Sequence, residues 1–493
     1  MNESTSPIVP IRRFNENSND YLSLSDHRSN VYKFQQEHCM SEGMRDIHVP
    51  KESECLWKWN KTHYRKLFKL EAEKMCEDFM SSKKRFPTMN DPQDKNYEPN
   101  SARIKEFLGC LKRNCTIDNQ IDSGNSWLFP MEPMSDPSMI IPFKNGLFDF
   151  SKYLIDGQMK DCMMHHTPRF FNSWVIPYDL NVHLENGRRP VLFLEALGKI
   201  FNEDPYSGTH DSIDLLFEYL GYAMTDLATH HKMLLLIGES GSGKSTIQRI
   251  FQKVVGFENC VNPSVATLYR QFGMSQWLHK RLAIFGDFYI PKTYQKEIEE
   301  SILKVTGGDL FTVEKKIINE TVQSKIYAKI VIASNKTPNF KSSKEAFSRR
   351  CLFLYFDKKA DQDPNFESTI EKEIPLIFIE AIQGLRRLIK RGKIGFIQPK
   401  SSEFLALRMQ RGQSSLAAFV NEKCILSPSL ETPKAFLSNE YANWCLENDE
   451  EMEEGHFKTN LLDMFGNKVK ESRPGTEDRV YMYKGIGLKK EQK

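Results

Sequence analysis

Four short, continuous apolar runs divide the middle of the chain. They lie at residues 233–237, 282–285, 330–333 and 352–356, and stretches with the spacing of helices separate them. Continuous runs are typical of strands that are buried on both faces, because a strand with one solvent-exposed face alternates apolar and polar residues. The pattern therefore predicts an α/β fold, in which residues 206–400 form a mostly parallel sheet flanked by helices.

The region before this sheet has a weaker pattern. Residues 1–45 are polar, and we expect them to form a mobile tail. Residues 46–205 combine a charged helical stretch at 64–80 with short strand-like pieces, and the pair Asn145-Gly146 between apolar runs favours a β-hairpin. This part of the chain is predicted to be an α+β domain.

The region after the sheet begins with one long helical pattern. It predicts a helix over residues 366–390 despite Pro375, after which glycines and a proline break the chain near residue 400. Residues 401–493 indicate two or three short helices and a strand at 481–483. We therefore expect a small separate domain at the C-terminal end.

Composition and charge exclude several classes of protein. The 68 Lys+Arg and 65 Asp+Glu residues nearly balance, so any contact with nucleic acid must be local rather than a blanket of positive charge. No stretch approaches the roughly 18 consecutive apolar residues of a membrane span, and the first twenty residues lack the apolar core of a secretory signal. We expect a cytoplasmic protein with no membrane partner, and its ten cysteines, which form no CxxC pair, are expected to be free thiols.

A glycine-rich loop follows the first apolar run. It reads Gly238-Glu239-Ser240-Gly241-Ser242-Gly243-Lys244-Ser245, which matches GxxxxGK[ST], and a helical pattern continues from Thr246. Glycines let backbone N–H groups turn inward around phosphates, Lys244 reaches the β and γ phosphates, and the Ser245 hydroxyl binds Mg²⁺. The sequence therefore predicts an ATP site here, and the alternative is a glycine-rich turn that binds nothing.

Polar residues end the next two predicted strands. Asp287 follows the run at 282–285, and a carboxylate at the carboxyl end of a parallel strand is suited to bind the magnesium of a nucleotide. The run at 330–333 leads into Ser334-Asn335, where the amide is suited to orient water or to contact the γ-phosphate. The alternatives are that Asp287 caps its strand and that Ser334-Asn335 forms an ordinary turn.

The glycine-rich loop, Asp287 and Ser334-Asn335, taken in this order along the chain, resemble the motifs of superfamily-3 helicases. The resemblance is specifically to the phage and plasmid primase-helicase family that includes poxvirus-type replication ATPases. Residues 303–309 are similar to the family's segment between acid strand and sensor strand, and residues 332–335 to its sensor motif. The resemblance implies an AAA+-like P-loop ATPase core at 206–400, preceded by a helicase-associated domain at 46–205 and followed by a winged-helix-like domain at 401–493.

The same resemblance implies a site that is shared between subunits. Arg349 and Arg350 stand before an apolar strand, where the family places an arginine that reaches a neighbour's nucleotide within a ring, usually a homo-hexamer. The alternative is that both arginines form surface ion pairs. The family usually carries two adjacent acids at its second motif, whereas Gly286 and Phe288 flank a single Asp287 here, which leaves open which carboxylate polarises water.

Contact with DNA is expected at one hairpin. Residues 311–325 are predicted to form a hairpin in the ring's channel, with Lys315 and Lys316 on phosphates, although such a lysine pair is often only a solvated surface feature. Tyr441 and Trp444, three residues apart, are expected to pack a helix rather than to touch DNA.

The function that follows is an ATP-dependent DNA helicase that replicates a mobile genetic element by moving along single-stranded DNA at a replication fork. Only about fifty mostly polar residues precede Cys55, so we expect a separate primase or initiator protein as a partner. The alternative is a nucleotide-switched assembly or loading ATPase that does not unwind DNA processively. A purely structural role is the third reading, and it leaves the complete loop unexplained.

Overall fold

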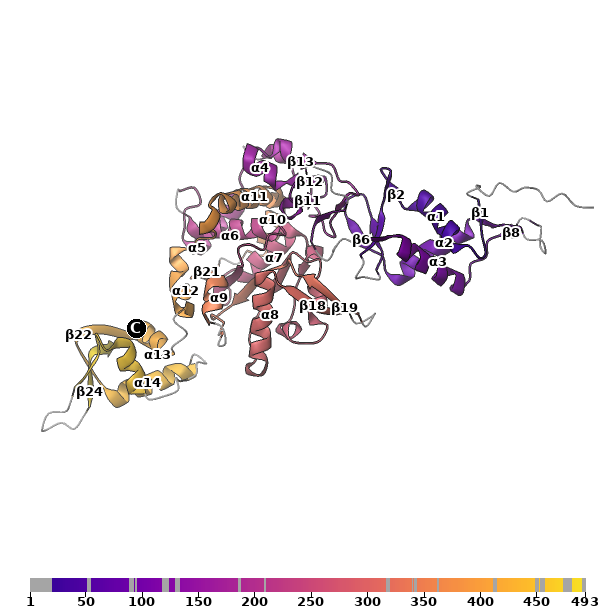
Figure 1. Cartoon of the computed structure of the whole chain (residues 1–493). Helices are drawn as coiled ribbons and strands as arrows, with labels where there is room; N and C mark the ends of the chain where they lie inside the picture. Colours follow the sequence, from indigo (N-terminus) through magenta and orange to yellow (C-terminus); the bar gives the residue numbers. More distant parts are fainter. Residues whose placement is uncertain are drawn as a thin grey trace, which may run out of the picture.

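A five-stranded parallel sheet lies at the centre of the computed structural model (Figure 1). Its strands are β15 (Met233–Gly238), β16 (Cys260–Val261), β17 (Leu282–Phe285), β20 (Lys329–Ser334) and β21 (Cys351–Phe356). They lie in the order β16-β17-β20-β15-β21, and every pairing is parallel. The parallel sheet predicted from the continuous apolar runs is therefore confirmed, and only the two-residue strand β16 was too short to leave a signal.

The structure describes residues 20–50, 55–87, 93, 95–117, 124–128, 134–184, 188–207, 210–315, 320–338, 340, 344–360, 363–410, 415–447, 452, 457–472 and 481–489.

Helices cover both faces of the sheet, and β15 shows why. Leu234 and Leu236 belong to one hydrophobic cluster with the helices α5, α6, α7 and α11. Met233, Leu235 and Ile237 belong to a second cluster with α8, α9 and α12. Alternate side chains of a strand point to opposite faces, so a strand covered on both sides must be apolar throughout. The bounds are α5 (Val191–Phe201), α6 (Asp211–Ala223), α7 (Lys244–Val255), α8 (Gln295–Gly307), α9 (Lys344–Arg350), α11 (Ile374–Lys390) and α12 (Glu403–Gln410).

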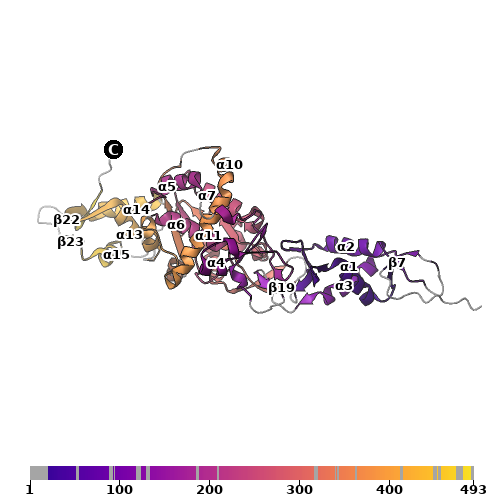
Figure 2. The same ribbon diagram turned by 90° about the horizontal axis from the view of Figure 1, so that it is seen from above.

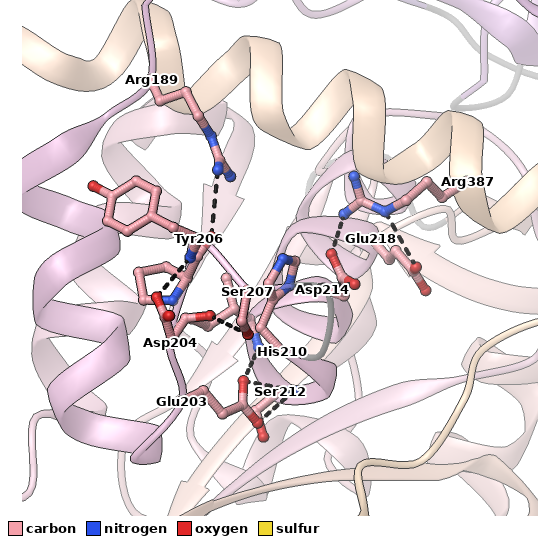
Figure 3. Close-up of polar contacts among 12 residues, drawn as sticks. Arg189, Glu203, Asp204, Tyr206, Ser207, His210, Ser212, Asp214, Glu218 and Arg387 are labelled. Carbon is pink, nitrogen blue, oxygen red and sulfur yellow. Dashed lines mark hydrogen bonds and ion pairs between the residues drawn. The ribbon is translucent and has the colours of Figure 1, made fainter.

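The helices α6 and α11 pack unusually closely. A Cβ atom added to Gly384 would lie 2.7 Å from the carbonyl carbon of Phe217, and one added to Gly221 would meet the backbone of Ala381. Ion pairs line the edge of this contact: Arg387 lies 2.7 Å from Asp214, and Arg391 lies 2.6 Å from the nearly inaccessible Glu218 (Figure 3 shows Arg387 between Asp214 and Glu218). Glycines permit the close approach, and the ion pairs fix its register.

The predicted helix over residues 366–390 is interrupted. The chain instead forms α10 (Phe366–Ile370), a 3₁₀ turn at Glu371–Glu373 and then α11, with Pro375 in the first turn of α11. Proline is tolerated there because the first amides of a helix have no partner within the helix. The prediction of one continuous helix was therefore wrong.

The part of the chain before α5 contributes to the same core. The hairpin predicted around Asn145-Gly146 is confirmed by the antiparallel pair β11 (Ile140–Phe143) and β12 (Gly146–Asp149), and buried residues of both strands join the cluster that covers α6 and α11. The cluster therefore contains buried residues from both sides of the domain boundary that was predicted at residue 205. The neighbouring elements are α4 (Phe150–Asp156), β10 (Ser126–Trp127), β13 (Met163–Met164) and β14 (Phe170–Phe171).

The N-terminal helices form a core of their own at one end of the molecule (Figures 1 and 2). They are α1 (His27–His38), α2 (Lys69–Ser81) and α3 (Ser101–Asn114). They accompany the strands β1 (Tyr21–Leu22), β2 (Met40–Ser41), β3 (Met44–Arg45), β4 (Ile47–Pro50), β5 (Trp57–Trp59), β6 (Tyr64–Lys66), β7 (Lys84–Arg85), β8 (Lys95–Asn96) and β9 (Thr116–Ile117).

Two predictions for this end need correction. Residues 20–45 are not a tail, because Leu22, Val31 and Phe34 are fully buried in the N-terminal core, while residues 1–19 lie outside the described part of the chain. A few apolar residues at helical spacing suffice for burial although the average composition is polar. The stretch at 64–80 begins as strand β6, and its helix starts only at Lys69.

The C-terminal residues form another separate core at the opposite end (Figure 2). The elements are α13 (Ser415–Lys423), β22 (Cys424–Pro433), α14 (Lys434–Glu447), α15 (Phe457–Phe465), β23 (Lys470–Ser472) and β24 (Met482–Leu488). The strands form an antiparallel sheet in the order β22-β24-β23. Tyr441 and Trp444 are buried against α13, as predicted. Within the described ranges, no helix combines the length and the apolar character needed to cross a membrane.

The Gly384→Ala substitution tests the close contact between α6 and α11. The added methyl group would meet the backbone of α6, which cannot move aside as a side chain can, so we expect a loss of about 1–3 kcal/mol in stability. The matched control is Gly109→Ala on α3, where the nearest atom to the new Cβ is the Arg113 guanidinium at 3.5 Å. Thermal unfolding should show a lower midpoint for the first variant and an equal or higher one for the control. Equal midpoints in both variants would contradict the packing described.

Candidate functional site

The glycine-rich loop (residues 238–245) joins β15 to α7 at the carboxyl edge of the sheet. Gly241 and Gly243 have φ angles of +80° and +94°, in the left-handed region that favours glycine. A side chain on Gly238 would collide with the backbone of Phe356 in the neighbouring strand. Each glycine is therefore required by the course of the backbone, which turns tightly into the first turn of α7.

Lys244 is held inside this loop by uncharged acceptors. Its ammonium group donates to the carbonyl oxygens of Gly238 and Glu239, each at 2.6 Å, and lies 3.3 Å from the Ser242 hydroxyl. Burial lowers the pKa of Lys244, and the carboxylates of Asp287 and Glu239 oppose that shift. Burying a cation that is not paired with a carboxylate costs free energy, so the position of Lys244 favours the binding of an anion beside it.

A cavity of about 1240 Å³ opens beside the loop. It is larger than the roughly 300–1,000 Å³ of most small-molecule sites. Gly238 and Glu239, which were predicted to bind the nucleotide, are not among the lining residues. The other predicted residues of the loop meet Asp287 and Asn335 there, and the lining includes Ser240, Gly241, Ser242, Gly243, Lys244, Ser245, Thr246, Asp287, Ser334 and Asn335. The first amides of α7 lie at the same place, and such amides are unpaired within a helix and carry partial positive charge.

The strand order explains why Asp287 and Asn335 reach this cavity. The strand β20 lies between β15 and β17, so the residues that follow all three strands leave the sheet at one edge. The Gln248 side chain of α7 donates to the Phe285 carbonyl at 2.8 Å, which ties the helix to the end of β17. The Ser334 hydroxyl accepts a hydrogen bond from the Lys336 amide, so Ser334-Asn335 does form a turn. Asn335 is nevertheless exposed on the cavity wall, so the turn also presents an amide side chain to the cavity.

Two elements that the sequence analysis did not assign to the site form its other walls. The helix α5 contributes Ala196 and Ile200 to the cavity lining, and the carboxylate of Glu373 accepts the first amides of this helix at 2.9–3.1 Å. Arg189, just before α5, pairs with Glu380 of α11 at 2.7 Å. It also donates to the Pro205 carbonyl, and Figure 3 shows the Arg189 side chain directed toward this turn, next to Tyr206. Most of these contacts join residues that are far apart in the sequence, so no local pattern predicted them.

The short helix α10 closes the cavity on the side of α7. Arg249 lies 2.6 Å from Glu367 of α10, and Lys253, one turn further along α7, lies 2.6 Å from Glu371 in the 3₁₀ turn that follows α10. Two ion pairs therefore join α7 to this segment. Lys358 and Lys359, which line the cavity one residue beyond the end of β21, were not predicted. The sequence did offer one indication of their place: they follow the predicted strand at 352–356, which ends at the same edge of the sheet as the strand before the loop.

Arg349 and Arg350 do not lie in the cavity of their own chain. They end α9 at the amino end of β21, where Cys351 pairs with Met233, whereas Gly238 pairs with Phe356 at the cavity edge. A six-residue strand is about 20 Å long, so the two arginines lie across the sheet from the loop. The Arg349 side chain is 71% exposed and lies 3.4 Å from Glu345, whereas Arg350 donates to the Ala346 carbonyl and its Nε atom is buried.

The hairpin predicted over residues 311–325 is confirmed. The strands β18 (Leu310–Lys315) and β19 (Glu320–Lys325) pair antiparallel in register, and Phe311 and Val313 anchor the base of the hairpin in the hydrophobic core. Lys315 is the last residue of β18, opposite Glu320, and Lys316 lies outside the described residues. Gly308, with φ +72°, ends α8 and turns the chain into this hairpin.

The residues present suit a magnesium ion better than a metal held by protein alone. Among the described residues there is no group of three or more His, Cys, Asp or Glu side chains that could hold a metal. Magnesium is usually held by one or two carboxylates together with phosphates and water, so a cluster of ligands is not required. Ser245 and Asp287, which line the same cavity, are the side chains placed for that role.

Comparisons with known proteins add little beyond this geometry. Residues 236–350, which include the loop and both arginines, match a family of unknown function (DUF5906). No curated protein matches the chain. A solved structure titled "The A form apo structure of NrS-1 C terminal region-CTR" has a TM-score of 0.45 at 9% identity and covers 93% of this chain and 98% of its own. The apo structure of NrS-1 C terminal region (305-718) has a TM-score of 0.34 at 11% identity and covers 72% and 95%.

Proposed function

We propose that this protein is an ATP-dependent DNA helicase that replicates a mobile genetic element and moves along single-stranded DNA as a ring. One observation carries the proposal: the glycine-rich loop, Asp287 and Asn335 line one cavity although they come from three different strands of the sheet. We assign residues 206–400 to an AAA+-like P-loop ATPase core on this basis and on the resemblance of the motifs to superfamily-3 helicases.

The proposed ligand is ATP with magnesium. The amides of the loop and the first turn of α7 are suited to bind phosphate oxygens, and Lys244 is suited to exchange its carbonyl partners for them. Bound magnesium would supply Lewis-acid stabilisation of the charge that develops on the phosphate oxygens. Ser245 and Asp287 would hold it, and Asn335 would orient the attacking water from the neighbouring strand. Asp287 stands without an adjacent second acid, so the carboxylate that accepts a proton from water is left open.

The proposed oligomer is a homo-hexameric ring built head to tail. Arg349 and the cavity lie at opposite edges of the sheet, and a head-to-tail contact brings opposite edges of neighbouring subunits together. The exposure of Arg349 favours it over Arg350 as the residue that reaches a neighbour's nucleotide. There it would stabilise charge that develops in the transition state.

The flanking regions fit roles in DNA binding. The C-terminal order of helix, strand, two helices and two strands is the order of a winged-helix domain, so we propose that residues 401–493 form one. We propose that residues 46–205 act as the helicase-associated domain, and that a separate primase or initiator protein is a partner. The hairpin β18–β19 would carry Lys315 and Lys316 toward DNA in the ring's channel.

One feature favours a second candidate. Gly286 and the buried Phe288 flank Asp287, so the end of β17 offers a single carboxylate for hydrolysis. A protein that binds ATP but hydrolyses it slowly would serve as a nucleotide-switched assembly or loading ATPase. Such a switch would turn over at a rate that DNA does not change, whereas a translocating helicase is stimulated when its channel is filled.

The first test is ATP hydrolysis by the purified protein with and without single-stranded DNA. We expect hydrolysis that DNA stimulates, and a fall of about a hundredfold or more in Lys244→Ala, because that variant loses the cation placed for the phosphates. Lys393→Ala, which changes an exposed lysine away from the cavity, should behave as the wild type. Steady hydrolysis that ignores DNA would favour the assembly switch.

The Arg349→Ala substitution tests the shared site. The variant should still bind ATP, because Arg349 lies far from its own cavity, but it should hydrolyse ATP about a thousandfold more slowly. Mixing it with Lys244→Ala protein should restore part of the activity, since some interfaces then combine an intact loop with an intact arginine. Absence of any recovery in rings shown to exchange subunits would rule out catalysis across the interface.

The double substitution Lys315→Ala with Lys316→Ala tests the hairpin. Basal hydrolysis should stay at the wild-type level, while affinity for single-stranded DNA and stimulation by DNA should both fall, because two phosphate contacts are lost. The slope of affinity against salt concentration should also become shallower by about one to two. Wild-type affinity and stimulation in the double variant would remove the hairpin from the DNA path.

A further inference from the structure

Two adjacent lysines, Lys358 and Lys359, line the cavity and follow Asp357 in the chain. In the described part of the chain, neither Lys358 nor Lys359 lies within ion-pair distance of a carboxylate, and the recorded contact of Lys358 is a long one, 3.5 Å, to the Asn202 side-chain oxygen. Arg249 on the same wall is paired with Glu367 at 2.6 Å. The two lysines therefore place positive charge at the cavity that the protein leaves available to an anion.

The backbone holds these lysines against the glycine-rich loop. The pairing of Gly238 with Phe356 makes the chain after β21 leave the sheet beside the loop. The Ala360 amide then donates to the Gly241 carbonyl at 3.0 Å, and its Cβ lies 3.5 Å from the place of a Cβ on Gly243. The two lysines therefore belong to a segment that is hydrogen-bonded to the glycine-rich loop through Ala360.

We propose that Lys358 and Lys359 bind the phosphate chain of the nucleotide held by the same subunit, together with Lys244. The inference rests on the proposed ATP site and adds a second set of cations to it. A nucleoside triphosphate remains negative after one magnesium ion binds, and hydrogen bonds from lysine to phosphate oxygens are charge-assisted and strong. Because the attraction grows with the charge of the ligand, the pair favours a triphosphate over a diphosphate.

The alternative is that both lysine side chains are solvated and that only the backbone of this segment contributes to the site, by positioning the loop. Exposed lysines are usually solvated, and the contact between Ala360 and Gly241 would position the loop whatever side chains flank it. The alternative predicts that nucleotide binding is insensitive to the charge at positions 358 and 359. The two accounts therefore differ in a measurable quantity.

The test is equilibrium binding of Mg–ATP and Mg–ADP to the full chain by calorimetry. The double variant Lys358→Gln with Lys359→Gln should bind Mg–ATP about tenfold more weakly or worse, with a smaller loss for Mg–ADP and a difference from wild type that shrinks at high salt. Lys358→Arg with Lys359→Arg should keep most of the affinity. The matched control is Lys390→Gln with Lys393→Gln, two exposed lysines outside the cavity, which should bind as the wild type does.

Each outcome separates this inference from the proposed function. Wild-type affinity in the glutamine pair, with binding lost in Lys244→Ala, would overturn the role of the two lysines and leave the ATP site standing. An equal loss in the arginine and glutamine pairs would also overturn it, because charge would then not be the cause. If the wild type binds neither nucleotide, the ATP site fails and this inference fails with it.

Discussion

Burial of β15 on both faces is the constraint on which the rest of the structure depends. Its odd and even side chains enter two different hydrophobic clusters, so helices must cover each side of the sheet. A strand in that position is bordered by β20 and β21, and all three run in the same direction. The loops that follow these strands are therefore gathered at one edge, with the glycine-rich loop in the middle.

This arrangement gives the two edges of the sheet different chemistry. The carboxyl edge carries the cavity, with Lys244 held by carbonyl oxygens and Asp287 and Asn335 facing the same space. The amino edge carries Arg349, which is exposed and remote from that cavity. In the proposed ring, the arginine of one copy would reach the cavity of the next, and the separation of loop and arginine within one chain is the structural reason for that proposal.

Local patterns predicted the sheet, the glycine-rich loop and the hairpin at 311–325, because each depends on residues that are close in the sequence. The walls formed by α5 and α10 were not predictable in this way. They depend on contacts such as those of Glu373 with the start of α5 and of Arg249 with Glu367, whose partners are more than a hundred residues apart. Average composition also gave a wrong prediction for residues 20–45, where a polar segment buries a few well-spaced apolar side chains.

The most direct measurement is the equilibrium binding of ATP to the isolated protein in the presence and absence of magnesium, with Lys244→Ala measured in parallel. The account predicts saturable binding that magnesium strengthens and that the substitution removes, without loss of the folded state as judged by thermal unfolding. Absence of ATP binding by the folded wild-type protein, or equal binding by Lys244→Ala, would contradict the assignment of the cavity to a nucleotide.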